Sequence, residues 1–144
     1  MDRDEAWARV RSARVGRMAT VTSQGRPHVV PFVFVLAEQG STRLAYWTVD
    51  RKPKRSRDLK RIRTLEANPA VEFVVDGYDE DWDRLWWVRC SGIARVVVSQ
   101  DERGSALRAL EEKYPQYAND PRDGPVVAIE IESIDGWEGK AQAP

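Results

Sequence analysis

The stretch LAYWTVDRKPKRSRDLKRIR, residues 44–63, joins an apolar aromatic run to a strongly basic one. Its first part has the aromatic and β-branched residues of a strand, and its last part places leucine and isoleucine at helical spacing. Residues 51–63 hold eight of the 23 Lys and Arg residues and one acid, in a chain without formal net charge. The stretch therefore predicts a strand, a basic loop and a helix, in that order.

A basic loop that leads into a helix favours binding of an anion. Free backbone N–H groups and the positive end of the helix dipole point the same way as Lys52, Lys54 and Arg55. Thr48 and Ser56 add hydroxyl donors. The sequence is thus compatible with a phosphate site at this junction, and a solvated basic helix face is the alternative.

Composition favours one soluble domain that spans residues 1–144, with 42% apolar and 32% charged residues. No apolar run approaches the roughly 20 residues of a membrane span, so we expect no membrane association. The N-terminal sequence MDRDE lacks the pattern of a signal peptide, which predicts a cytoplasmic protein. A single cysteine (Cys90) and a single histidine (His28) argue against a disulfide, an all-protein zinc site and Ser-His-Asp or Cys-His catalysis.

Hydrophobic alternation and turn residues predict six strands connected by hairpins or by single helices. Such an order is typical of a small antiparallel barrel with helices over its openings, a mainly β (α+β) fold. The expected strands are residues 18–22, 28–36, 43–49, 70–75, 85–98 and 126–131, and the expected helices are residues 4–14, the one that ends at 68–69, and 99–114.

Four local signals refine this prediction. Gly16 is expected to end the first helix as a C-cap. Pro31 cannot donate to a β ladder, so it marks an edge strand, a bulge, or a place where a ligand replaces the neighbouring strand. Gly92 indicates a bulge in the fifth strand. Ser99 followed by Glu102 forms a capping box that begins the last helix.

Trp86 and Trp87 are neighbours on one expected strand, so their side chains point to opposite faces of the sheet. One of them can fill the core, and the other needs a cover. A homodimer interface is the favoured cover. A hydrophobic lid and a surface for a planar ligand are the alternatives.

Four segments, taken in order, resemble the pyridoxamine 5'-phosphate oxidase-like split barrels. These segments are TVTSQGRPHVVP at 20–31, WT at 47–48 before the basic loop, NPAV at 68–71 and VRCSGIA at 88–94. Within that family the chain is most similar to the oxidoreductases that depend on the deazaflavin coenzyme F420. The resemblance covers roughly residues 6–135.

The resemblance implies a six-stranded antiparallel split barrel that forms a homodimer, with two cofactors at the interface. It places the cofactor ring against the strand that includes His28, Val30, Pro31 and Phe32. It assigns the cofactor phosphate to Thr48, Lys52, Lys54, Arg55 and Ser56. Because Arg55 lies at the start of the helix, it should contribute more to binding than Arg61 or Arg63.

The implied activity is hydride transfer between reduced coenzyme F420 and an unsaturated small-molecule substrate. An FMN-dependent oxidoreductase of the same fold and a non-catalytic deazaflavin-binding protein are the alternatives. A nucleic-acid-binding module is disfavoured by the acidic residues 76–83 and a pI near 6.6. No catalytic residue is assigned, and His28, Tyr46 and Tyr78 are proton-donor candidates only if they reach the substrate.

Overall fold

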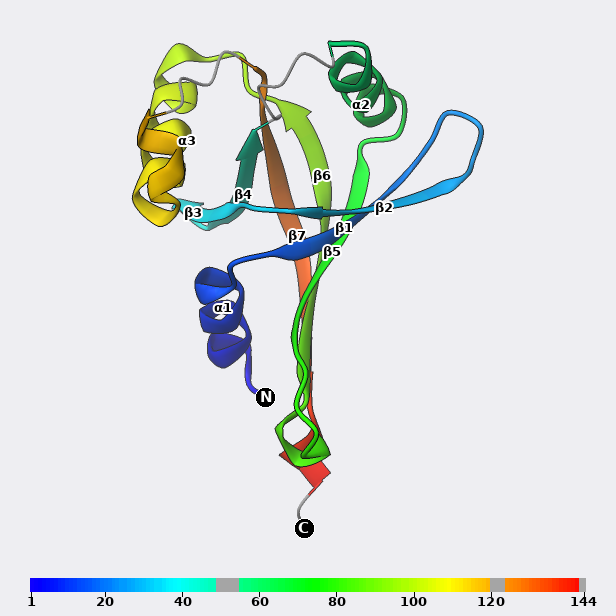
Figure 1. Cartoon of the computed structure of the whole chain (residues 1–144), viewed down its shortest axis with the longest axis vertical. Coiled ribbons are helices and arrows are strands. Elements are labelled where there is room, and N and C mark those ends of the chain that lie inside the picture. The colour runs from blue at the N-terminus through cyan, green and yellow to red at the C-terminus, as the bar shows by residue number, and fades with distance from the viewer. Residues whose placement is uncertain (49–54, 120–123, 143–144) are drawn as a thin grey trace.

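A computed structural model describes residues 1–48, 55–119 and 124–142, and of residues 55–60, 119, 141 and 142 only the backbone. Seven strands in this part of the chain form one curled antiparallel sheet, which helices flank (Figure 1). The strands are β1 (Gly16–Val21), β2 (Pro27–Phe32), β3 (Val35–Gln39), β4 (Thr42–Thr48), β5 (Ala70–Gly77), β6 (Trp86–Val96) and β7 (Val126–Glu138). The helices are α1 (Arg3–Ser12), α2 (Arg55–Ala67) and α3 (Gln100–Lys113), with 3₁₀ turns η1 (Trp82–Arg84), η2 (Pro115–Asn119) and η3 (Gly139–Gln142). None of the described helices is long and apolar enough to cross a bilayer.

The strand order is β2-β1-β5-β6-β7-β4-β3, which leaves β2 and β3 at the two edges. These two strands are consecutive in the chain, and only Val33 and Phe34 lie between them. The sheet therefore has to curl until its two edges approach each other at these residues. In Figure 1, β2 accordingly runs across the central strands. The mainly β class and the antiparallel pairing agree with the sequence prediction, whereas the six-strand count and the closure of the barrel are not confirmed.

The additional strand arises because the expected strand 28–36 is interrupted at Phe34. The Phe34 backbone N–H donates to the Tyr114 hydroxyl at 3.3 Å, and the Phe34 carbonyl accepts from the Lys113 Nζ at 2.9 Å and from the Tyr114 hydroxyl at 3.0 Å. The peptide groups of Phe34 thus pair with side chains at the end of α3 and not with a strand. A single run of apolar residues is thereby divided into β2 and β3.

The main core fills the inside of the curl. Three phenylalanines form its centre: the ring centroids of Phe32, Phe34 and Phe73 lie 5.0–5.4 Å apart. Phe34 and Phe73 are at most 1% exposed. Cys90 lies in the same core, and burial raises the pKa of its thiol to about 12. A second, smaller apolar cluster packs between the sheet and α3.

The local signals are mostly confirmed. The register of β6 against β7 shifts at Ser91/Gly92, where a bulge was expected. The Ser99 side chain accepts from the Glu102 backbone N–H at 3.3 Å and caps α3. Pro31 lies on an edge strand. The expected cap at Gly16 is wrong, because α1 ends at Ser12 with Ala13 as its C-cap and Gly16 begins β1.

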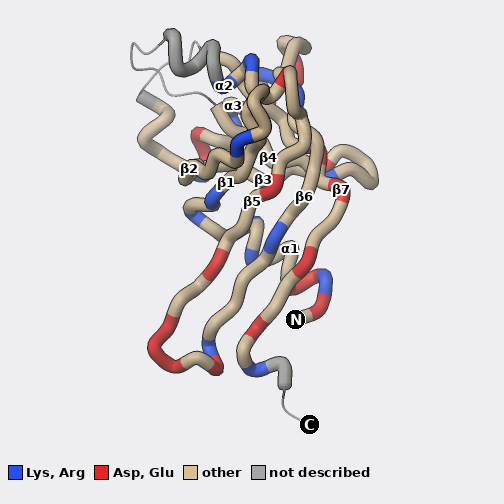
Figure 2. Tube along the Cα trace, turned by 90° about the vertical axis from the view of Figure 1, so that its right-hand side faces the viewer, with Lys and Arg blue, Asp and Glu red and all other residues tan. Residues whose placement is uncertain are grey.

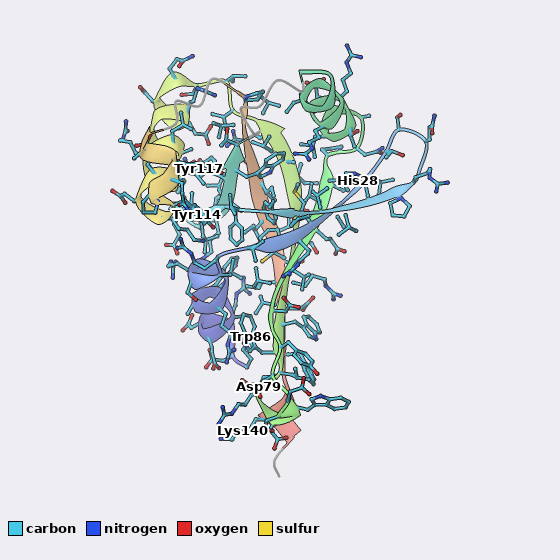
Figure 3. The ribbon with its side chains drawn as sticks, in the orientation of Figure 1. His28, Asp79, Trp86, Tyr114, Tyr117 and Lys140 are labelled. Carbon is cyan, nitrogen blue, oxygen red and sulfur yellow. The ribbon has the colours of Figure 1, made fainter. Side chains whose placement is uncertain are left out.

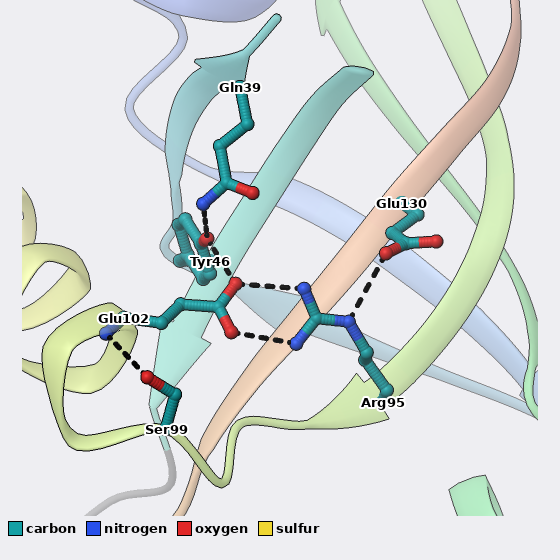
Figure 4. Close-up of polar contacts among 6 residues, drawn as sticks. All are labelled: Gln39, Tyr46, Arg95, Ser99, Glu102 and Glu130. Carbon is teal, nitrogen blue, oxygen red and sulfur yellow. Dashed lines mark hydrogen bonds and ion pairs between the residues drawn. The ribbon is translucent and has the colours of Figure 1, made fainter.

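A polar network fastens α3 to the sheet (Figure 4). The Arg95 guanidinium of β6 donates to both carboxylate oxygens of Glu102, at 2.9 and 2.8 Å, and its Nε donates to Glu130 of β7 at 3.2 Å. The Tyr46 hydroxyl of β4 donates to Glu102 at 2.6 Å. The hydrogen bond from Arg95 is the main cause that lowers the pKa of Glu102, while burial raises the pKa of Tyr46.

We expect Glu102→Gln to lower the free energy of unfolding at neutral pH by about 1–2 kcal/mol, because the bidentate charged pair with Arg95 is lost. The pKa of Glu102 is lower in the folded state, so this stabilisation is present above its ordinary value of 4.5 and disappears as the pH falls through the folded-state pKa. Urea unfolding at several pH values measures the difference from the wild type. The difference should become smaller in acid. Glu132→Gln, at an exposed glutamate, is the control. A gap that stays constant with pH would refute this account.

Candidate functional site

A cavity of about 780 Å³ opens between β1, β2, the end of β4, α2 and the segment that follows α3. This volume is within the range of about 300–1,000 Å³ that is typical of small-molecule and cofactor sites. The cavity lies against one face of the hairpin of β1 and β2, and β2 is an edge strand of the described sheet.

The hairpin of β1 and β2 supplies one wall of the cavity. Thr20 is opposite His28 in the register, and Met18 is opposite Val30, and all four side chains line the cavity. Pro31 and Phe32 complete this wall. The four residues for which the resemblance implies contact with a cofactor ring therefore lie together at one cavity. The hairpin is fixed by a turn with Gly25 at φ 78°, which suits glycine.

The end of β4 supplies a second wall through Trp47 and Thr48. The Thr48 hydroxyl donates to the Pro125 carbonyl at 3.1 Å, so it can bind a phosphate as a donor only if this hydrogen bond is exchanged. The Trp47 side chain is 4% exposed, and its indole N–H has no partner among the described residues. Lys52 and Lys54 lie outside the described residues, and of Arg55 and Ser56, which begin α2, only the backbone is described.

The helix α2 contributes Arg61, Thr64 and Leu65, which share one face at helical spacing. Arg63 is also exposed, but it does not line the cavity. Sequence reasoning had placed Arg61 and Arg63 together, apart from Arg55. The signal that separates them is the four-residue distance from Arg61 to the buried Leu65, because residues four apart in a helix lie on the same side.

Sequence reasoning missed the wall that follows α3. Tyr114 at the C-cap of α3 and Gln116 and Tyr117 of η2 line the cavity. The two tyrosine rings are tilted, with centroids 6.0 Å apart. The Tyr114 hydroxyl is within 2.9 Å of the Arg14 carbonyl and 3.0 Å of the Phe34 carbonyl, and burial raises its pKa. In the sequence, only Pro115 after the expected helix marks this segment. A proline at this position predicts that the helix ends, but it does not predict that the residues after it line a cavity.

Of the three proton-donor candidates, His28 alone lines the cavity. Tyr46 donates to Glu102 beneath α3, and Tyr78 is 70% exposed near the far end of β5. Figure 3 shows His28 on β2 at one side of the site and Tyr114 and Tyr117 beside α3 at the other. Near Tyr114, burial and then Arg14 lower the pKa of Lys113 to about 8.

The described wall of the cavity contains no carboxylate, and Arg61 is its one Lys or Arg residue. The acidic residues of the β5–β6 turn lie at the end of the molecule remote from α2 (Figure 2). This distribution favours a neutral or an anionic ligand over a cationic one.

Comparisons with known proteins agree on the fold. The family profile described as pyridoxamine 5'-phosphate oxidase matches residues 3–138. A conserved hypothetical protein from Mycobacterium tuberculosis superimposes with a TM-score of 0.77 at 21% identity, covering 100% of this chain and 89% of its own. An FAD binding protein from Mycobacterium smegmatis gives 0.64 at 20% identity, with 95% of each chain covered.

The heme storage protein HutZ from Vibrio cholerae gives a TM-score of 0.66 at 16% identity, covering 94% of this chain and 93% of its own. At these identities the likeness concerns the fold alone, because proteins of one fold serve different functions. Comparison with curated protein sequences gives no match.

Proposed function

Because the chain belongs to the pyridoxamine 5'-phosphate oxidase family, we propose that its cavity binds a flavin-type cofactor and that the protein is an oxidoreductase. One observation carries the proposal. The β2 residues His28, Val30, Pro31 and Phe32 and the β4 residue Thr48, which is distant from them in the sequence, line the same cavity of about 780 Å³. The FAD binding protein from Mycobacterium smegmatis, which has the same fold, supports the proposal by analogy.

The ring of the cofactor lies against β2 in this proposal, and its phosphate points toward Thr48 and the basic residues 51–63. Val30, Phe32 and Leu65 supply the apolar contacts with the ring, and they keep water away from it. The phosphate end is assigned to Lys52, Lys54, Arg55 and Ser56 on the sequence pattern, since these side chains are outside the described residues.

Coenzyme F420 is the proposed cofactor, and FMN is the alternative. Eight cations within residues 51–63 exceed what one phosphate requires, and they suit the additional carboxylates of the F420 tail. The bound cofactor supplies a hydride, a proton with two electrons, for one atom of an unsaturated bond in a small-molecule substrate. The second atom of that bond would take a proton from solvent water.

Titration of the purified protein with coenzyme F420 and with FMN, followed by fluorescence, tests the proposal. We expect saturable binding with one cofactor per chain, tighter for F420. Riboflavin, which lacks the phosphate, is the control and should bind more weakly than FMN. The proposal fails if neither cofactor binds. Turnover assays with the loaded protein then separate an oxidoreductase from a non-catalytic deazaflavin-binding protein.

We also propose that the protein is a homodimer and that Trp87 contributes to the interface. The Trp86 ring packs against the main core and under the Arg9 guanidinium, 4.6 Å from the ring centroid. Trp87 is on the other face, in register with Trp137 and beside Arg89. Of the two tryptophans, Trp87 is therefore the one whose apolar ring remains for a second copy of the chain to bury.

Trp87→Glu is expected to convert a dimer into a monomer at micromolar concentration, because a carboxylate at an apolar interface loses its hydration. Sedimentation velocity measures the change. Trp82→Glu, at an exposed tryptophan of η1, is the matched control and should remain dimeric. A wild-type monomer at this concentration would refute the dimer.

A further inference from the structure

Lys113, the last residue of α3, has its amine fixed at the connection between β2 and β3. The Lys113 Nζ donates to the Phe34 carbonyl at 2.9 Å. The same atom lies over two aromatic rings, 4.5 Å from the Phe34 ring centroid and 5.4 Å from the Tyr114 ring centroid. The Lys113 side chain is partly exposed. The fold thus holds a primary amine in one place and leaves it within reach of a reagent from solvent.

No carboxylate of the described residues forms an ion pair with this amine. Arg11, by contrast, pairs with Glu38 at 3.0 Å. The ionisable groups around Lys113 are Arg14 before β1, the hydroxyls of Tyr114 and Tyr117, and the exposed Glu111 and Glu112 of α3. The contacts of Lys113 are one carbonyl and two ring faces, which attract a cation without neutralising it.

Arg14 places a second cation beside this amine. The Arg14 guanidinium donates to the Lys113 carbonyl at 2.7 Å and lies over the Tyr114 ring, 4.6 Å from its centroid. Burial, and then the charge of Arg14, lower the pKa of Lys113 to about 8. At pH 7 about a tenth of the amine is then uncharged and nucleophilic, far more than for a lysine of ordinary pKa.

We propose that Lys113 is a site of covalent acylation by a small acyl phosphate, with the Lys113 amine as the nucleophile and Arg14 as the group that binds the phosphate. The uncharged Nζ attacks the acyl carbon and a C–N bond forms. The bond between that carbon and the bridging phosphate oxygen breaks, and inorganic phosphate leaves with the electron pair. The proton lost by the nitrogen passes to water, and nothing is oxidised or reduced.

Arg14 determines the class of acyl donor. Its side chain is exposed, and the planar guanidinium has N–H donors whose geometry suits phosphate oxygens. Two neighbouring cations without a paired carboxylate attract an anion and raise its local concentration. A neutral acyl donor gains nothing from this field. The inference goes beyond the proposed function and does not depend on which cofactor the cavity binds.

Acylation of Lys113 changes the contact at Phe34. The amide that forms at Nζ has no charge, so the cation over the two aromatic rings is lost, and the acyl group needs space beside the Phe34 carbonyl. Phe34 connects the two edge strands of the sheet. The acylated protein should therefore melt about 2–5 °C below the unmodified protein.

Incubation of the purified chain with acetyl phosphate, followed by site-resolved mass spectrometry, tests the inference. At pH 7.5 we expect Lys113 to be acetylated about tenfold faster than the exposed Lys140, because its larger share of uncharged amine outweighs its lower basicity and partial burial. The rate at Lys113 should level off above about pH 8. The rate for Nα-acetyl-lysine amide, a free amine of ordinary pKa, should continue to rise.

A second reagent isolates the role of Arg14. N-acetoxysuccinimide is a neutral acetyl donor, so it acylates the same amine without a phosphate. Arg14→Gln should slow acetylation of Lys113 by acetyl phosphate about tenfold. It should slow the reaction with the neutral ester about threefold or less, because the neighbouring charge then no longer lowers the pKa of Lys113. Arg11→Gln, at an exposed arginine that pairs with Glu38, is the matched control and should change neither rate.

Lys113→Arg keeps the charge and removes the acylated amine. Treatment with acetyl phosphate should lower the melting temperature of the wild type and leave that of this variant unchanged. Equal acetylation rates at Lys113 and Lys140 would overturn the inference. Equal slowing of both reagents by Arg14→Gln would overturn the assignment of the phosphate to Arg14 and, with it, the donor class.

Discussion

Arg55→Ala is expected to weaken cofactor binding about ten- to a hundredfold, because a charge-assisted hydrogen bond to the phosphate contributes about 1.5–3 kcal/mol. Arg55 is the first residue of α2, where free backbone N–H groups and the helix dipole favour the same anion. Arg61→Ala should cost less, about threefold, because Arg61 lines the cavity from an exposed position where solvent screens its charge. Arg63→Ala should have no effect, because Arg63 is exposed outside the cavity.

Dissociation constants for coenzyme F420 and FMN across these three variants, at two salt concentrations, measure this ranking. Arg63→Ala is the control for the general loss of positive charge, since it removes the same group from the same helix. If the cations of α2 instead bind the phosphate backbone of a nucleic acid, each substitution should reduce the affinity for that nucleic acid by a similar factor. The affinity should also fall steeply as the salt concentration rises. Equal losses at all three positions would therefore contradict the assignment of the phosphate to Arg55.

Phe73→Ala is expected to lower the free energy of unfolding by about 3–5 kcal/mol, the usual cost of truncating a buried phenylalanine. Phe73 is 1% exposed on β5 and touches both Phe32 and Phe34, so its removal leaves a cavity where the two edges of the sheet approach each other. A loss of this size is a large fraction of the stability of a typical domain.

Urea unfolding measures this loss. Phe73→Leu should retain most of the stability because it keeps much of the apolar volume. Val21→Ala, at a valine that is 42% exposed, is the surface control and should change stability by about 0.5 kcal/mol or less. Comparable losses for Phe73→Ala and Val21→Ala would show that the phenylalanine cluster does not dominate the core.

Local signals predicted what depends on neighbouring residues in the chain. The hairpin of β1 and β2, the end of α2 at Ala67 before Asn68-Pro69, and the cap of α3 at Ser99 all follow from short motifs. These features need no knowledge of distant partners, because the turn and cap residues themselves satisfy the backbone groups.

The features that were missed depend on partners distant in the sequence. The division of residues 28–36 requires Lys113 and Tyr114, about 80 positions away, to bond the Phe34 backbone. β7 continues to Glu138, beyond the expected end at Ile131, because it pairs with the whole of β6 as far as Trp86. The η2 wall has the same origin: a single 3₁₀ turn has no periodicity by which sequence reasoning can identify it.

Of the candidate site, sequence reasoning identified the wall on β2 and the end of β4, because the resemblance covers those segments residue by residue. All of His28, Val30, Pro31, Phe32 and Thr48 line the cavity. It could not identify Gln116 and Tyr117, which lie at the cavity because α3 packs against β3 and β4 and its C-cap, Tyr114, reaches the Arg14 carbonyl just before β1. The roles of these residues in binding stay predictions.

The hydrogen bond at Phe34, between β2 and β3, affects how tightly a ligand can be held. The Phe34 carbonyl accepts from the Tyr114 hydroxyl, and Tyr114 also lines the cavity. The same side chain therefore holds both the connection between the two edge strands and the cavity wall that follows α3. The tyrosine wall is thus in place before any ligand arrives. A preorganised wall spares the ligand the entropic cost of ordering it, so a modest number of contacts can give useful affinity.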